Sequence, residues 1–370
     1  MTRRRYENCF GGEAGSSMQG NKIQRINMIS GYLKEHFGEK VVKLALDGGF
    51  TCPNRDGSKG VGGCIFCSAD GSGEFAGSIP SQIALLSKKW PRAKYIAYFQ
   101  NHTNTYAPVS ELREKFTAAL NYKFESGTEY PEIVGLAIAT RPDCLNDEIY
   151  EFLYELSQKT FLWVELGLQS IHEQTGSTIN RCHSLDVYDN AVNRLAALGI
   201  RTVTHLIFGL PKKINADGSV IPETREEMLA SVRHICRALP AAETAPRPDY
   251  ALSASVSEAS LSSNSLNVSQ SLCGRHIFGI KLHMLNIVRG SQMEYLCPDY
   301  IPFSNIDEYT DLVVDALKII PRDITVHRMS ADAPRSILIA PEWSYKKRTI
   351  LNSIHRKMAE RNIYQGQDAE

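Results

Sequence analysis

The sequence lacks an excess of either charge and a long apolar run, and we expect it to carry no secretory leader. Lys plus Arg and Asp plus Glu balance at 41 each, so no global field draws the chain toward nucleic acid or a membrane surface. Apolar runs such as Ile133–Ala139 are far too short to span a bilayer. Residues 1–20 carry three arginines but no apolar segment, which argues against a signal peptide. We therefore expect no membrane contact.

The sequence also lacks a second CxxC pair and any HxxxH pair. Its nine cysteines, with no secretory signal, favour a reducing compartment, and we expect a cytoplasmic protein. Three of them, Cys52, Cys64 and Cys67, lie in one Gly-rich loop directly after the apolar run Val41–Asp47. The glycines allow this loop to fold Cys52 back onto the CxxC pair. Three thiolates without an evident fourth ligand predict a metal centre with an open coordination position.

Short apolar runs alternate with helical patterns, which predicts a parallel sheet covered by helices and joined by right-handed crossovers. The expected strands are Val41–Asp47, Lys94–Gln100, Glu132–Thr140, Phe161–Gly167, Arg201–Gly209, Gly279–Val288 and Asp323–His327. The expected helices are Asn21–Phe37, Ser81–Trp90, Val109–Phe124, Asn146–Lys159, Leu185–Leu198, Glu223–Leu239 and Ile306–Ile320. Six or seven repeats are too few for an eight-fold barrel, so we predict an α/β fold with a partial (β/α)6 TIM-like barrel. Its chemistry belongs at the carboxyl ends of the strands, where the cysteine loop lies.

We expect three parts along the chain: a disordered tail over residues 1–20, a core barrel over 21–290 and a small C-terminal extension over 291–370. The stretch 241–272 is rich in Ser and Ala, and we expect it to be a disordered surface insertion in the barrel. The extension ends in a helix with apolar residues on one side and basic residues on the other. That basic face is either a solvated surface or a contact for RNA or another anion.

The spacing Cx11CxxC admits three interpretations. A structural zinc site needs a fourth ligand, which Cys144 or the Cys182-His183 pair could supply through space. Unrelated free thiols are a second interpretation, although their gathering in one Gly-rich loop makes it unattractive. The third is a 4Fe–4S cluster held by three cysteines, which leaves one iron to bind a substrate or a cofactor.

A series of motifs extends this pattern along the chain. In order they are Ala45–Gly57, Thr103–Pro108, Thr140–Asp143, Val164–Ser170, His205–Pro211, Gly279–His283, Ala333–Arg335 and Ala340–Ser344. Together they resemble the radical S-adenosylmethionine (SAM) superfamily, specifically its YhcC/YtqA-type subgroup, over residues 22–240 and 275–366. Several also resemble the radical SAM domain of the Elongator catalytic subunit, which acts in tRNA wobble-uridine modification and shares the long first cysteine spacing.

The resemblance implies that Cys52, Cys64 and Cys67 ligate the cluster, that SAM chelates the open iron, and that Phe66 lies against the adenine. Further SAM contacts come from strand ends: Gln100 and Asn104 at the methionyl amino group, Glu165 and Gln169 at the ribose, and Ile207 and Gly209 along the adenine. One electron from an external donor of the flavodoxin or ferredoxin type then cleaves SAM, and a 5′-deoxyadenosyl radical abstracts hydrogen from substrate.

Several of these polar residues have simpler interpretations. Glu165 could pair with Arg141, Asp143 could cap the following helix, and His205, His283 and His327 could be satisfied core histidines. The chain also departs from the subgroup's pattern, because Cys182 stands where we expect Gly and the insertion at 241–272 is long.

The resemblance predicts a radical SAM enzyme whose substrate is tRNA, modified at the wobble uridine. One alternative is a barrel-type metal-dependent hydrolase that uses the three histidines and Glu165 at strand ends. The other is a non-catalytic RNA-binding module that uses the basic C-terminal helix; the neutral overall charge weighs against it.

Overall fold

A computed structural model describes residues 24–68, 71, 73–124, 132–237, 277–331 and 333–369. The tail expected over residues 1–20 and the insertion expected over 241–272 lie outside these ranges.

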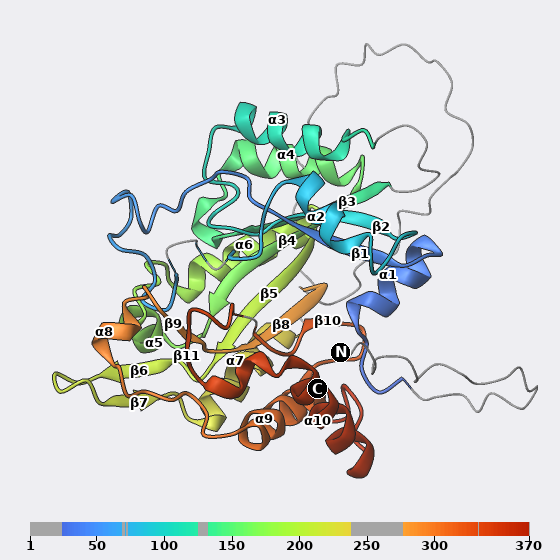
Figure 1. Cartoon of the computed structure of the whole chain (residues 1–370). Helices are drawn as coiled ribbons and strands as arrows, with labels where there is room; N and C mark the ends of the chain where they lie inside the picture. Colours follow the sequence, from blue (N-terminus) through green and yellow to red (C-terminus); the bar gives the residue numbers. More distant parts are fainter. Residues whose placement is uncertain are drawn as a thin grey trace, which may run out of the picture.

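Seven parallel strands form one curled sheet in the order β1-β2-β3-β4-β5-β8-β10 (Figure 1). Their bounds are Val41–Leu46, Lys94–Phe99, Ile133–Thr140, Phe161–Gln169, Arg201–Phe208, Gly279–Met284 and Thr325–Arg328. Each lies within or close to a predicted strand, and the near-continuous apolar runs fit strands that are buried on both faces. The predicted α/β partial barrel is confirmed.

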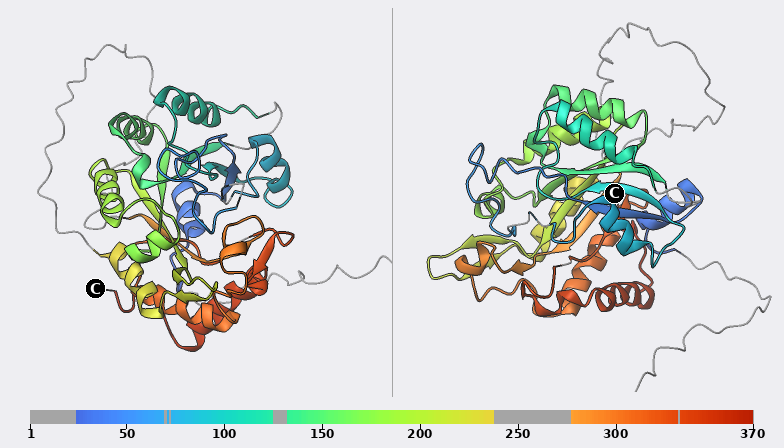
Figure 2. Two further views of the ribbon diagram at one scale, coloured as in Figure 1. Left: turned by 90° about the vertical axis from the view of Figure 1, so that its left-hand side faces the viewer. Right: turned by 45° about the horizontal axis from the view of Figure 1, so that its top comes forward.

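Helices cover the outer face of the sheet (Figures 1 and 2). The longer ones are α1 (Ile29–Phe37), α2 (Ile79–Leu86), α3 (Val109–Leu120), α4 (Asp147–Ser157), α6 (Leu185–Ala197), α7 (Arg225–Cys236), α9 (Ile306–Ile319) and α10 (Lys347–Glu360). Asn146 caps α4 by accepting a hydrogen bond from the backbone of Ile149, and Gly199 ends α6 with a φ of 68°. Helix α1 begins later than predicted.

The amino ends of the strands are closed by α1, which packs against both edge strands, β1 and β10. Just before this helix, Met28 forms a parallel bridge with Val326. On the helix, Ile29 and Leu33 join Phe161 and other apolar side chains in one buried cluster. This closure leaves the carboxyl ends of the strands as the accessible end of the barrel.

Some elements escaped prediction because they are short. A hairpin of β6 (Pro211–Ile214) and β7 (Val220–Pro222) follows β5. The predicted strand Gly279–Val288 divides into β8 and a short β9 (Ile287–Val288), which pairs with β11 (Leu338–Ala340). Short helices α5 (Glu173–Thr178) and α8 (Met293–Leu296) lie near the same end of the barrel (Figure 1).

The domain boundary predicted at residue 290 stays a prediction. The sheet continues beyond it, because β10 pairs with β8. Across the described residues, no helix has both the length and the apolar character needed to cross a bilayer.

Candidate active site

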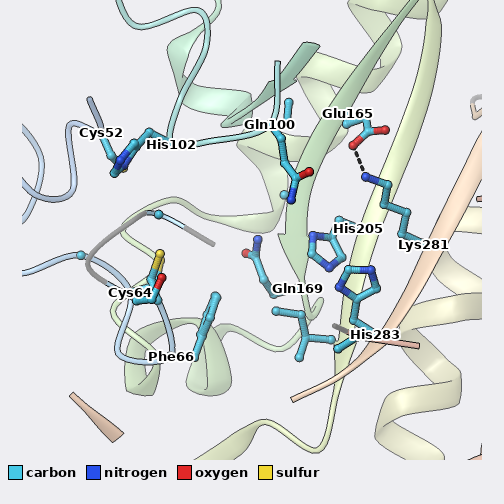
Figure 3. Close-up of a pocket in the computed structure, with 18 of the residues that line it drawn as sticks. Cys52, Cys64, Phe66, Gln100, His102, Glu165, Gln169, His205, Lys281 and His283 are labelled. Atoms are coloured by element: carbon cyan, nitrogen blue, oxygen red, sulfur yellow. Dashed lines mark hydrogen bonds and ion pairs between the residues drawn. The ribbon is translucent and has the colours of Figure 1, made fainter. Parts of the chain in front are cut away.

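A cavity of about 450 Å³ opens at the carboxyl ends of the strands. The cysteine loop lines one side, and residues from β2, β4, β5 and β8 line the other (Figure 3). Its size lies within the range of ordinary small-molecule sites, roughly 300–1,000 Å³. The barrel fold predicts that the active site lies at this end of the strands, and the structure places the three cysteines there.

Glycine conformation shapes the cysteine loop. Gly57, Gly62 and Gly63 have positive φ angles of 90°, 82° and 79°, which other residues adopt at a cost. Gly60 does not, but a Cβ there would lie 2.0 Å from the side-chain oxygen of Asn54. Glycine is therefore favoured at three of these positions by the backbone conformation and at the fourth by the lack of space for a side chain.

Cys52, Cys64 and Cys67 all line the cavity and are partly buried. Burial, together with the neighbouring Cys67, raises the pKa of the Cys64 thiol to about 12. Such a thiol stays protonated at neutral pH unless a cation at the sulfur stabilises the thiolate. An iron–sulfur cluster supplies that charge, so the donor set fits the group.

The three sulfurs line the cavity without forming a compact ligand set. In the part of the chain that the structure describes, no three His, Cys, Asp or Glu side chains are gathered to hold one metal ion. A cubane cluster is wider than one ion, so spaced thiols around a cavity suit a cluster better than tetrahedral zinc.

Arg141 and Asp143 form a buried pair beside the cysteines. The guanidinium donates from Nε to Asp143 Oδ1 at 2.9 Å, and Lys59 adds a second contact to the carboxylate at 3.0 Å. Burial opposes ionisation of Asp143, but these cations hold the pKa of its carboxyl below the ordinary value. Two simpler interpretations are therefore wrong: Arg141 pairs with Asp143 rather than Glu165, and Asn146 rather than Asp143 caps α4.

Glu165 on β4 instead pairs with Lys281 on β8, inside the barrel, as the dashed line in Figure 3 marks. Trp163 Nε1 donates to the carboxylate at 2.9 Å, and Lys281 Nζ also donates to the hydroxyl of Tyr98 at 2.8 Å. Burial alone would raise the pKa of Glu165, yet the charges of Lys281 and Lys43 outweigh it and hold that pKa well below its usual range. The carboxylate is ionised and its charge is compensated.

His205 and His283 form a second polar pair on the cavity wall. Their ring centroids are 4.1 Å apart with an interplanar angle of 70°. Burial and the charge of Lys281 lower the pKa of His205 to about 3, and burial also lowers the pKa of His283 well below its ordinary value. Among the described residues, Nε2 of neither ring has a hydrogen-bond partner. Both imidazoles are neutral and face the cavity, so they are not satisfied core histidines.

His327 has a different environment. It is buried, and its Nε2 lies 3.1 Å from the hydroxyl of Thr325 on the same strand. It does not line the cavity, so it is a core histidine, but it is only half satisfied because its Nδ1 has no hydrogen-bond partner among the described residues.

The predicted SAM contacts divide into two groups. Phe66, Gln100, Glu165, Gln169 and Ile207 all line the cavity. The other two, Asn104 and Gly209, are not among its lining residues. The side chain of Asn104 donates to three backbone carbonyls, including that of Ala139 at 2.8 Å, and the carbonyl of Gly209 accepts from Tyr300 at 2.8 Å. The roles of all seven in binding SAM stay predictions.

Sequence reasoning assigned no role to Lys281, Tyr98 or Arg328, which also line the cavity. A signal was present, because Lys281 is a charged residue within the apolar run that forms β8. A lysine in the interior of a covered parallel strand requires a buried partner.

Comparison with known proteins identifies the family. A family model for the radical SAM superfamily matches residues 52–217, and one for the radical SAM C-terminal domain matches residues 277–360. Protein YtqA of Bacillus subtilis is 39% identical over 355 residues, which cover 94% of this chain and 93% of YtqA. Protein YhcC of Escherichia coli K12 is 32% identical over 344 residues, which cover 91% and 94% of the two chains.

Among solved structures, Elp3 from the archaeon Methanocaldococcus infernus matches with a TM-score of 0.57 at 16% sequence identity. The match covers 88% of this chain and 64% of the Elp3 chain, so this protein spans less than two thirds of that Elp3. This likeness shows a shared fold. The family models and the 39% identity to YtqA over 94% of this chain lead to one conclusion: the chain belongs to the radical SAM superfamily, whose enzymes use a 4Fe–4S cluster and SAM.

Proposed function

We propose that Cys52, Cys64 and Cys67 hold the 4Fe–4S cluster of this radical SAM enzyme and that the adjoining cavity takes SAM. One observation carries the proposal: three thiols from one loop line the same cavity as five of the residues predicted to contact SAM. When bound, the cluster and SAM supply a 5′-deoxyadenosyl radical that abstracts hydrogen from a substrate.

In this proposal the residues of the cavity bind and orient SAM next to the cluster. Phe66 offers an aromatic face next to the cluster ligands, and Gln169 has a side-chain oxygen without a partner among the described residues. A buried acceptor of this kind favours a ligand that donates to it, because leaving it unpaired costs about 1–3 kcal/mol. Glu165 and Lys281 supply a fixed, compensated dipole on the opposite wall.

The electrostatics of the cavity suit a reactive radical. Both histidines are neutral and Glu165 is held by Lys281, so proton exchange with these groups is suppressed near neutral pH.

Loss of iron on cysteine substitution tests the ligand assignment. After anaerobic reconstitution, Cys52→Ala, Cys64→Ala and Cys67→Ala should each lose most of the bound iron and sulfide. Cys236→Ala is the matched control, because Cys236 is buried in α7 and does not line the cavity. Full iron content in any of the three cavity variants would contradict the assignment of that residue.

For the substrate we propose tRNA, modified at the wobble uridine. Two observations support it: the motifs shared with the radical SAM domain of the Elongator catalytic subunit, and the fold shared with Elp3 over 88% of this chain. Modified nucleosides in bulk tRNA from cells with and without the gene test the proposal. A change confined to wobble uridine is expected, and an unchanged profile would reject tRNA as the substrate.

The reducing electron comes in our proposal from a small external carrier of the flavodoxin or ferredoxin type, as radical SAM enzymes generally require such a donor.

The alternative of a metal-dependent hydrolase is disfavoured, because Glu165, one of its proposed metal ligands, already binds Lys281 and Trp163. The basic face of α10 is also smaller than predicted, because Lys357 is buried and pairs with Asp307 and Asp311, and Arg361 pairs with Asp311.

A further inference from the structure

Two asparagines connect the cysteine loop to a distant part of the chain. Asn54 lies in the loop itself and is fully buried, and Asn180 lies just after α5. We call this pair the asparagine clamp. Neither residue belonged to the predicted site, and the segment that contains Asn180 is the one that departs from the subgroup's pattern at Cys182.

Asn180 fixes the backbone of the loop. Its side-chain amide donates to the carbonyl of Gly63 at 2.8 Å and to that of Val61 at 3.2 Å. Gly63 directly precedes Cys64 and Val61 lies three residues before it, so the amide sets the path of the chain as it enters the CxxC pair. Asn180 itself has a φ of 54°, a left-handed conformation that asparagine tolerates better than most residues.

Arg181, the residue after Asn180, attaches this segment to the barrel and is 1% exposed. Its guanidinium donates to the carbonyls of Leu168 at 3.1 Å and Ser170 at 2.5 Å, at the carboxyl end of β4. The backbone of Ile65 adds a hydrogen bond to the carbonyl of Ile179 at 3.1 Å. The cysteine loop is therefore held to the barrel strand rather than only to itself.

Asn54 adds a contact to sulfur. Its Nδ2 donates to the backbone carbonyl of Asn180 at 2.5 Å and lies 3.6 Å from Cys64 Sγ, within hydrogen-bonding distance for sulfur. The absence of a side chain at Gly60 makes room for Asn54, because a Cβ there would lie 2.0 Å from Asn54 Oδ1. The clamp thus places one N–H dipole at one cysteine sulfur.

We propose that Asn54 is a positioning residue that sets the reduction potential of the cluster through Cys64, and that Asn180 is a positioning residue that retains the cluster by ordering the loop. This inference rests on the proposed function. An N–H donor at a ligating sulfur stabilises negative charge there, and the reduced cluster carries one more electron than the oxidised one. The donor therefore favours reduction, the step that radical chemistry needs.

Potentiometric titration followed by electron paramagnetic resonance tests the role of Asn54. Asn54→Leu keeps a similar shape and removes the donor, so the reduced-to-oxidised ratio at fixed potential should fall about three- to tenfold, equal to ~30–60 mV for one electron. Asn215→Leu is the control, because Asn215 lies in the exposed β6–β7 turn and bonds to Ser219. An unchanged potential in Asn54→Leu would overturn the proposal.

A measurement on the unaltered chain covers the case in which Asn54→Leu fails to fold. Protein labelled with 15N only at asparagine side chains should show a hyperfine coupling from Nδ2 to the reduced cluster. Asn54 supplies such a contact, because its Nδ2 lies 3.6 Å from Cys64 Sγ. A reduced cluster without this coupling would refute the contact.

Asn180→Gly separates the two roles. Glycine accepts the left-handed backbone without strain, so only the amide is lost. We expect iron loss to a chelator to be at least about threefold faster, with a potential close to that of the unaltered protein. Equal rates of iron loss would refute the retention role. A wild-type chain that takes up no iron would refute the proposed function together with this inference, whereas a normal cluster indifferent to both asparagines would refute the inference alone.

Discussion

The buried pair of Glu165 and Lys281 should behave as a coupled unit in stability measurements. Glu165 is 3% exposed and Lys281 is 5% exposed, so neither charge is solvated when its partner is removed. We consider Glu165→Leu, Lys281→Met and the double variant. Each single change leaves one buried charge without its hydrogen-bonded partner, whereas the double change removes both charges.

The expected change in unfolding free energy follows from the burial of both side chains. Removing one partner of a buried ion pair costs about 3–5 kcal/mol of unfolding free energy, while replacing both with apolar residues is often close to neutral. Here the double variant still leaves the Trp163 indole without its acceptor, which adds about 1–3 kcal/mol. The sum of the losses in unfolding free energy of the two single variants should therefore exceed the loss in the double variant. The difference, which is the coupling energy, should be at least about 2 kcal/mol.

Urea unfolding followed by tryptophan fluorescence gives these energies, provided that all four proteins share one m-value. A surface pair, Arg113 and Glu155 at 2.8 Å, serves as the comparison, since both are about half exposed and should couple by less than about 1 kcal/mol. Additive costs for Glu165 and Lys281 would mean that the pair is not ionised, and our description of the cavity charge would be wrong.

Three further outcomes follow from the site. Phe66→Ala should raise the Kd for SAM about tenfold while Phe66→Tyr changes it little, measured by equilibrium binding; an unchanged Kd in the alanine variant would remove Phe66 from the SAM site. Because the folded-state pKa of Glu165 is depressed, its contribution to stability is present above its unfolded pKa, near 4.3, and is lost as pH falls toward the folded value. The unfolding free energy of Glu165→Gln should thus fall less steeply below about pH 5 than that of the unaltered protein. The same pH dependence in both proteins would contradict the assigned direction of the pKa shift. The 15N shifts of His205 and His283 should stay constant from about pH 8 to 5, because burial keeps both rings neutral; protonation of either ring in that range would contradict this environment.

Much of the fold could be predicted because its determinants are local. Strands such as β3 and β5 are apolar on both faces, and the helices between them carry one apolar face each. The cysteine loop could be predicted because three thiols and its glycines lie within one short segment. The hairpin β6–β7 could not, since its strands are short and partly polar and take their place from contact with α5.

The partners within the site could not be predicted, because they depend on the order of the strands and on how distant segments fold together. Glu165 and Lys281 are 116 positions apart, and they meet because β4 and β8 lie on either side of β5 in the sheet. Asn54 and Asn180 are 126 positions apart and meet because α5 folds back onto the cysteine loop. Arg141 was a plausible partner for Glu165 from strand adjacency, but Asp143 is nearer and its geometry satisfies the guanidinium first.

The most direct test of the account is formation of 5′-deoxyadenosine from SAM by the anaerobically reconstituted protein under a strong reductant. We expect about four irons per chain, release of 5′-deoxyadenosine on reduction, and loss of both in Cys64→Ala but not in Cys236→Ala. A protein that binds the cluster fully and is reduced, yet leaves SAM intact, would contradict the proposal that this cavity presents SAM to the cluster.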